Sequence, residues 1–227
     1  MKHGKKWNAI RKKIDKTKEY TLVEAVEFLK ANSQVKFDET VEVAVNLGID
    51  PKKSDQSVRG SVVLPHGLGK SVRVLAFAVG DKAQEAKDAG AEFVGADDMA
   101  EKITGGWLDF DAVVATPDMM KVVGKLGKIL GTRGLMPNPK VGTVTMDIGK
   151  AIKELKKGKA DFRAEKGGIL HAPLGKLSFD AMRIQENVRA FLDAVAKVKP
   201  PSAKGAFIKK AVLTSTMGQG VKIITDV

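Results

Sequence analysis

A basic, glycine-rich run contains the residues of this sequence that most directly suggest chemistry. Between Met119 and Met146 the chain has five basic residues, five glycines and no acid. Glycine lets the backbone approach a ligand and expose its N–H groups, while lysine and arginine supply positive charge. Such a run suits a polyanion, although a solvated surface loop would have the same composition. The basic residues are Lys121, Lys125, Lys128, Arg133 and Lys140.

Two other glycine-bearing segments resemble nucleotide-binding motifs only in part. Residues 67–71 read GLGKS, like the end of a phosphate-binding loop, but Leu64 stands where that motif requires a glycine. The segment is also followed by a strand pattern instead of a helix. Residues 79–81 lack the full dinucleotide fingerprint. A nucleotide-binding enzyme that uses Gly124–Gly134 is therefore kept as the alternative function.

The content of metal-binding and nucleophilic residues argues against a catalytic or metal centre. The chain has no cysteine and three histidines, none of which has a partner at metal-ligand spacing. No nucleophile elbow is present. We expect no catalytic residue, no metal and no cofactor. The absence of cysteine also fits a protein of the reducing cytoplasm.

The overall charge points to an anionic partner. The formal net charge is +12 and the sequence pI is about 9.7, which favours a nucleic acid first and an anionic membrane surface second. No apolar run approaches the roughly 20 residues of a membrane span, so we expect no membrane partner.

Three further places combine residues that suit RNA. Lys36, Phe37 and Thr40 precede or open a predicted strand, and they offer a phosphate contact, a stacking face and a hydroxyl. Phe37 taken alone is more often a core aromatic. Residues 214–218 end another predicted strand with three hydroxyls and a turn, and Lys166 adds charge at a glycine turn.

The pattern along the chain predicts two kinds of sheet. Residues 40–47 alternate apolar and polar side chains, which is typical of an antiparallel strand with one buried face. Residues 72–79 and 112–115 are almost wholly apolar and alternate with helix patterns, which indicates a parallel sheet covered on both faces. Residues 160–165 and 169–172 read as a hairpin, and residues 178–198 as a long amphipathic helix.

The fold class is therefore mixed, with α+β and α/β parts. We predict a discontinuous α+β domain I with an antiparallel sheet, formed by residues 1–66 and 160–227. A Rossmann-like three-layer α/β domain II, formed by residues 67–159, is inserted into it. Residues 68–159 have a net charge of +3, and the rest of the chain has +9. Most of the attraction for an anion therefore lies in domain I, outside the glycine-rich run.

Taken together, the motifs resemble the bacterial large-subunit ribosomal protein L-one family, the proteins of the ribosomal stalk. The resemblance runs essentially from end to end. Its strongest block is LGKILGTRGLMPNPK at residues 126–140. Further blocks are FDETVE at 37–42, LGIDP at 47–51, LPHGLGK at 64–70, DFDAVVATP at 109–117, HAP at 171–173 and TMG at 216–218.

The resemblance implies a split domain I with an inserted domain II, and a ribosomal protein of the cytoplasm without enzymatic activity. It implies as partners the stalk region of large-subunit rRNA, the exit-site tRNA and the protein's own operon mRNA, with translational repression through the mRNA. No homo-oligomer is expected. The implied rRNA contacts are Lys36, Phe37, Thr40, Thr216, Met217 and Gly218.

The remaining candidate contacts are basic residues. Lys210 stands where the family has a serine, and with Lys166 it joins the candidate rRNA site. Lys125, Lys128, Arg133 and Lys140 are candidates for a secondary RNA contact, and Lys52, Lys53 and Arg59 for contact with tRNA.

Overall fold

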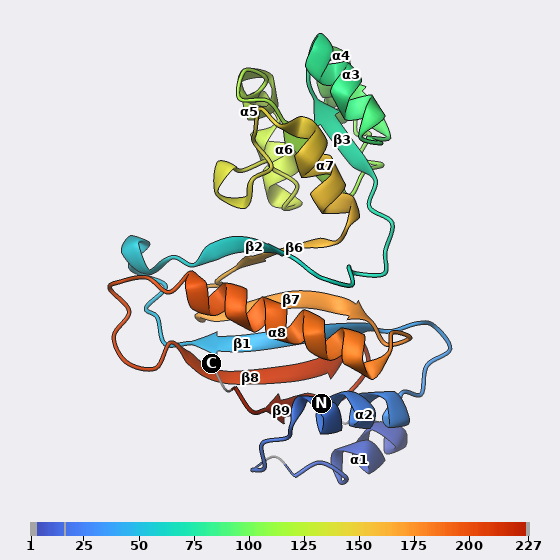
Figure 1. Cartoon of the computed structure of the whole chain (residues 1–227), viewed down its shortest axis with the longest axis vertical. Coiled ribbons are helices and arrows are strands. Elements are labelled where there is room, and N and C mark those ends of the chain that lie inside the picture. Colours follow the sequence, from blue (N-terminus) through green and yellow to red (C-terminus); the bar gives the residue numbers. More distant parts are fainter. Residues whose placement is uncertain (1–3, 16, 226–227) are drawn as a thin grey trace. The chain divides into compact units, whose positions relative to one another are not determined.

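The computed structural model describes residues 4–15 and 17–225, which form two compact units (Figure 1). Unit 1 consists of the described residues before Lys70 and after Lys159, and unit 2 runs from Lys70 to Lys159. The chain leaves unit 1 after Gly69 and returns to it at Ala160.

Unit 1 is built on an antiparallel sheet of four strands in the order β7-β1-β8-β9. A second sheet contains β2 and β6. The bounds of the elements are α1 (Lys5–Arg11), α2 (Leu22–Asn32), β1 (Thr40–Leu47), the 3-10 turn η1 (Ser54–Gln56), β2 (Arg59–Val63), β6 (Lys159–Arg163), β7 (Ile169–Lys176), α8 (Ala181–Lys197), β8 (Ile208–Ser215) and β9 (Val221–Ile223).

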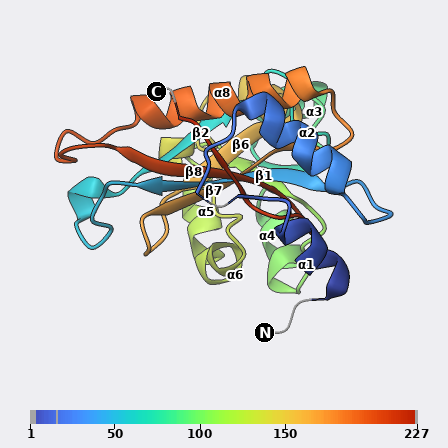
Figure 2. The same ribbon diagram turned by 90° about the horizontal axis from the view of Figure 1, so that it is seen from below.

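Local sequence explains the main elements of unit 1. Thr21 and Glu24 form a capping box that starts α2. In β1 the residues Val41, Val43 and Val45 are buried, whereas the residues between them are wholly or partly exposed. Helices α2 and α8 contact each other and cover one face of the sheet (Figure 2), where their apolar sides complete the core.

Unit 2 contains a parallel sheet of three strands in the order β4-β3-β5. Alternate residues of β3 face opposite sides. Leu75 and Phe77 pack against α4, α5 and α6, and Val74 and Ala76 pack against α3 and α7. The elements are β3 (Val74–Phe77), α3 (Asp81–Asp88), β4 (Phe93–Gly95), α4 (Asp97–Thr104), β5 (Ala112–Ala115), α5 (Met120–Lys125), α6 (Gly127–Thr132), the 3-10 turn η2 (Pro139–Val141) and α7 (Ile148–Lys156).

The predicted hairpin at residues 160–172 is wrong. The Glu165 N–H does donate to the Ile169 carbonyl at 3.0 Å across a turn. However, β6 then pairs with β2, and β7 pairs with β1 in the other sheet. The reason is long-range packing: Phe162 of β6 sets its ring against Phe191 of α8, with 5.4 Å between the ring centroids. Alternation in the sequence predicts two strands but does not say which strands pair.

The glycine-rich run is mostly helical, so the interpretation as a surface loop is wrong. Val123, Leu126 and Leu130 lie three and four residues apart and are buried in the core of unit 2. They fix α5 and α6 on the sheet although the segment is rich in glycine. Gly134, shortly after α6, and Gly142, at the end of η2, have left-handed backbone conformations, with φ of 72° and 73°.

An ion network fixes the point where the chain enters unit 2. Lys70 and Arg73 donate to the Asp111 carboxylate with 2.9 Å from the Lys70 Nζ and 3.1 Å from the Arg73 Nε. Arg73 also pairs with Asp109 at 3.0 Å. The Lys70 ammonium is the main cause that lowers the pKa of Asp111 to about 2. Asp111 is therefore ionised in the folded protein well below the pH at which it protonates in the unfolded chain.

We expect Asp111→Asn to destabilise unit 2 by about 1–2 kcal/mol at neutral pH. Because the folded pKa is lowered, this contribution is fully present above about pH 4 and is lost as the pH falls toward 2. Denaturant unfolding, followed by Trp107 fluorescence in a Trp7→Phe background, measures it. Asp109→Asn, which changes an exposed partner, should cost less. A difference between Asp111→Asn and the parent that stays constant from pH 6 to pH 2 would contradict the assignment.

Candidate nucleic-acid interface

The structure brings the predicted RNA residues from the two halves of unit 1 together. Thr40 opens β1, and Thr216 follows β8 directly, next to Ser215, which pairs with Val41. The Thr40 N–H donates to the Thr216 hydroxyl at 3.0 Å, and the Thr216 N–H donates to the Thr40 carbonyl at 3.1 Å. We call this end of the four-stranded sheet, where β1 begins and β8 ends, the Thr40 end.

Two large apolar side chains are exposed at the Thr40 end. Phe37 is 55% exposed and Met217 is 64% exposed. The interpretation of Phe37 as a core aromatic is therefore wrong, because the loop between α2 and β1 carries it outside the core. Exposed apolar groups beside hydroxyls and lysines suit a partner with flat apolar faces and phosphates. Lys36, next to Phe37, is exposed as well.

A hydrogen-bonded frame surrounds these residues. The Asp38 carboxylate accepts from the N–H and the hydroxyl of Ser178, at 3.1 and 2.8 Å. The Nζ of Lys176, at the end of β7, donates to the Thr40 hydroxyl at 3.0 Å. The hydroxyl oxygen of Thr40 thus accepts a hydrogen bond from Lys176, while the hydroxyl proton of Thr40 stays available to a ligand. Sequence analysis missed Lys176, since only the strand register places it opposite Thr40.

A buried carboxylate lies beneath the interface. Glu39 is 2% exposed. It accepts hydrogen bonds from the Ser33 hydroxyl and from the Met217 N–H, the latter at 2.9 Å. Burial raises the pKa of Glu39, but the hydrogen bonds from the Ser33 hydroxyl and the Met217 N–H lower it, and the pKa lies below its usual value. Glu39 is therefore ionised at neutral pH.

Gly218 completes the turn after β8 because there is no room for a side chain. A Cβ at this position would lie 2.3 Å from the hydroxyl oxygen of Ser215. The Gly218 N–H donates to the Ser215 carbonyl at 3.0 Å and closes the turn. The turn is therefore packed tightly on its inner side and exposes Thr216 and Met217 on its outer side.

Lys166 and Lys210 do not belong to the Thr40 end. Lys210 pairs with Asn46, near the opposite end of β1, and Lys166 lies in the turn just before Ile169, which also pairs with Asn46. Asn46 lies six residue steps along β1 from Thr40, a distance of about 20 Å. The two lysines therefore lie outside the Thr40 end, because the antiparallel direction of β8 carries Lys210 away from Thr216, and their contact with rRNA stays a prediction.

The opposite end of the sheet, the Leu47 end, has basic character of its own. Lys52 and Lys53 follow β1 and are exposed, and Arg59 opens β2 and is partly exposed. Pro51 lies against Gly168, beside Lys166. An open hollow of about 640 Å³ there is lined by Pro51, Ser57, Arg163, Ala164, Glu165, Lys166 and Gly167.

In unit 2 the basic residues of the glycine-rich run point outward. Lys121, Lys125, Lys128, Arg133 and Lys140 are all exposed, and none forms an ion pair with another described residue. A Cβ at Gly124, Gly127, Gly131 or Gly134 would meet nothing within 4 Å. Packing within the chain therefore does not require these glycines, and the surface they leave is open to another molecule.

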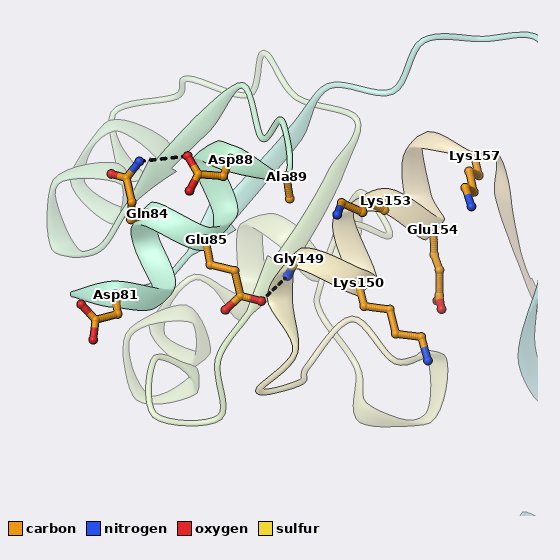
Figure 3. A pocket seen from close by; sticks show the side chains of 10 residues that line it. All are labelled: Asp81, Gln84, Glu85, Asp88, Ala89, Gly149, Lys150, Lys153, Glu154 and Lys157. Carbon is orange, nitrogen blue, oxygen red and sulfur yellow. Dashed lines mark hydrogen bonds between the residues drawn. The ribbon is translucent and has the colours of Figure 1, made fainter.

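One open hollow belongs to neither surface. It has a volume of about 800 Å³ and lies between α3 and α7 (Figure 3). Glu85 from α3 accepts from the Gly149 N–H of α7 at 3.2 Å. Acids of α3 face lysines of α7, a mixed charge that does not suit a phosphate-rich ligand. Among residues 4–15 and 17–225 no three His, Cys, Asp or Glu side chains gather as metal ligands.

In the part of the chain that is described, no helix combines the length and the apolar character needed to cross a bilayer.

This chain is similar to ribosomal proteins. Residues 29–219 match the sequence model of the ribosomal protein L1p/L10e family. The large ribosomal subunit protein uL1 of Chlamydia caviae is 56% identical over 224 residues, which cover 99% of this chain and 97% of that protein. The matched residues include the Thr40 end and the glycine-rich run.

We expect Phe37→Ala and Met217→Ala to change the free energy of unfolding by less than about 0.5 kcal/mol, because both side chains are largely exposed. The matched control is Phe191→Ala, which empties a fully buried site and should cost roughly 3–5 kcal/mol. Denaturant unfolding measures all three. A loss at Phe37 as large as at Phe191 would mean that Phe37 belongs to the core.

Proposed function

Since this chain belongs to the ribosomal protein L1p/L10e family, it is a structural, non-enzymatic protein of the large ribosomal subunit, and we propose that its Thr40 end binds the stalk region of large-subunit rRNA. The observation that carries the proposal is the exposed pair Phe37 and Met217, set beside hydroxyls and lysines in a hydrogen-bonded frame. The family assignment also replaces the nucleotide-binding enzyme considered as an alternative, and it places the protein on cytoplasmic ribosomes.

The chemistry of the Thr40 end fits a folded RNA. Phe37 offers a stacking face for an unpaired base, and the Thr40 hydroxyl can donate to a 2′-OH or a phosphate. The Thr216 hydroxyl donates to the Thr40 carbonyl at 3.4 Å and so orients the turn. Lys36 and Lys176 supply positive charge. The short reach of these groups and the rigid frame favour a fixed RNA shape over a flexible single strand. Met217 would pack against an exposed base or sugar.

We assign a secondary, backbone-directed RNA contact to the glycine-rich run of unit 2. Its lysines and Arg133 are exposed and unpaired within the described chain, and its glycines leave the surface open. Phosphates bind such a surface without sequence selection. In these terms unit 1 is the main RNA-binding domain I, and unit 2 is an inserted Rossmann-like domain II.

The Leu47 end offers a place for the exit-site tRNA. Lys52, Lys53 and Arg59 lie there, together with Lys166. Because this end is separated from the Thr40 end by most of β1, two RNAs can be bound at the same time without competing for one surface. Contact there would help the protein assist the release of exiting tRNA.

Repression of the protein's own operon mRNA needs no further surface. An mRNA leader that folds into the same shape as the rRNA junction would occupy the Thr40 end, so that free rRNA would displace it. The proposal involves a single copy of the chain.

We expect Met217→Asp to weaken binding of a stalk rRNA fragment by roughly 100-fold or more, because a carboxylate would be buried against phosphates without a partner. The substitution keeps the main-chain N–H of residue 217, which donates to Glu39, so the fold should survive. Filter binding or fluorescence anisotropy gives the affinity, and circular dichroism verifies the fold.

The control is Val198→Asp, at the end of α8 remote from Ser178, where the valine is 37% exposed. It adds the same charge outside the Thr40 end and should change affinity only a few-fold. Equal losses for the two variants, or near-normal binding by Met217→Asp, would reject the Thr40 end as the principal RNA site.

We expect Lys128→Ala to weaken RNA binding mildly and to flatten the slope of log K against log salt concentration by about 0.7–0.9, the effect of one lost phosphate contact. Lys150→Ala is the control, since Lys150 is also exposed in unit 2 but lies on α7, which covers the other face of the sheet. A slope that changes equally in both variants would show that only the net charge matters.

A further inference from the structure

Glu39 stands between residues that face the proposed ligand but does not face it itself. Its neighbour Thr40 is partly exposed and Phe37 is largely exposed, whereas the Glu39 side chain is 2% exposed and points inward. A carboxylate is among the groups least often buried, because water solvates it strongly. A buried one is therefore expected to have a specific structural or functional role.

The contacts of Glu39 connect segments that are far apart in the sequence. Its two carboxylate oxygens accept from the Ser33 hydroxyl, after α2, and from the Met217 N–H, 178 residues away. Its main-chain carbonyl accepts from the Leu177 N–H at 2.8 Å. The loop before β1, the end of β7 and the turn after β8 are thus all held by this one residue.

The charge of Glu39 is compensated by hydrogen-bond donors. Among the described residues no lysine or arginine pairs with its carboxylate. An unpaired buried carboxylate depends on its donors, and each donor in turn loses its partner if the carboxylate is removed. The Met217 N–H donates to this carboxylate at 2.9 Å, so the contact with Glu39 helps to hold the conformation of the turn.

We propose that Glu39 is the positioning residue of the RNA interface: its buried carboxylate holds the Thr216–Gly218 turn against the start of β1, in the conformation that receives RNA, without touching the RNA. This inference rests on the proposed function of the Thr40 end. A preformed turn spares the cost of ordering Met217 and Thr216 when RNA binds. Gly218 supports the arrangement from the other side, since the turn packs onto Ser215.

The test compares Glu39→Met with Glu39→Gln. Methionine is similar in size to glutamate but has no oxygen to accept the hydrogen bond from the Met217 N–H, so the turn loses this contact. Glutamine keeps an oxygen for the Met217 N–H and can donate its amide to the Ser33 oxygen. We expect Glu39→Met to lose roughly 10- to 100-fold in affinity for the stalk rRNA fragment, and Glu39→Gln to retain most of it. Both are measured where circular dichroism shows the full-length chain folded.

Two readouts separate positioning from a general loss of structure. Hydrogen exchange should speed up at the Met217 amide in Glu39→Met but not in Glu39→Gln, while amides of the central strands, such as Val43 and Leu213, stay protected. The slope of log K against log salt concentration should be unchanged in both variants, because no phosphate contact is removed.

The outcomes distinguish this inference from the proposed function. If Glu39→Met binds normally while Met217→Asp does not, the positioning role is rejected and the interface stands. If both bind normally, the interface itself is misplaced. If Glu39→Gln binds as poorly as Glu39→Met, the charge of Glu39 and not the geometry it imposes is what RNA binding requires, and the inference is overturned.

Discussion

The hydrogen bond between the buried Glu39 carboxylate and the Met217 N–H is the contact on which the proposed RNA interface of unit 1 depends. It joins the two halves of a domain that is interrupted by unit 2. Without it the turn after β8 would be held to β1 only through Thr40 and Thr216. A charged group accepts a stronger hydrogen bond than a neutral one, and burial removes the competition from water. A single carboxylate can therefore fix the conformation of an exposed turn.

The arrangement of charge explains how a strongly basic protein can bind RNA selectively. Lysines and arginines occur on three separate surfaces: the Thr40 end, the Leu47 end and the glycine-rich run. Phosphate contacts raise affinity but do not select an RNA. Among the described residues, the Thr40 end combines charge with two exposed large apolar side chains and oriented hydroxyls. In the proposed function, selection of an RNA shape therefore belongs to that end, and the other two surfaces add attraction.

Much of the fold could be predicted from local patterns, and the failures have a common origin. The alternation in residues 40–47, the capping box at Thr21 and the apolar stripe of α8 each determine an element through contacts with near neighbours. The hairpin at residues 160–172 failed because strand pairing depends on partners that lie far away in the sequence. The prediction for the glycine-rich run failed for a different reason. The composition of the run suggested a loop, whereas the spacing of Val123, Leu126 and Leu130 determines that the segment forms helices.

The sequence by itself determined the elements, the net charge and most residues of the candidate RNA site, because residue type and spacing are local properties. The tertiary structure decided which of these residues act together. It placed Phe37 outside the core, moved Lys166 and Lys210 to the opposite end of the sheet, and brought Lys176 to Thr40. The physical reason is that strand register and direction set these distances, and both follow from packing between segments separated by more than a hundred residues.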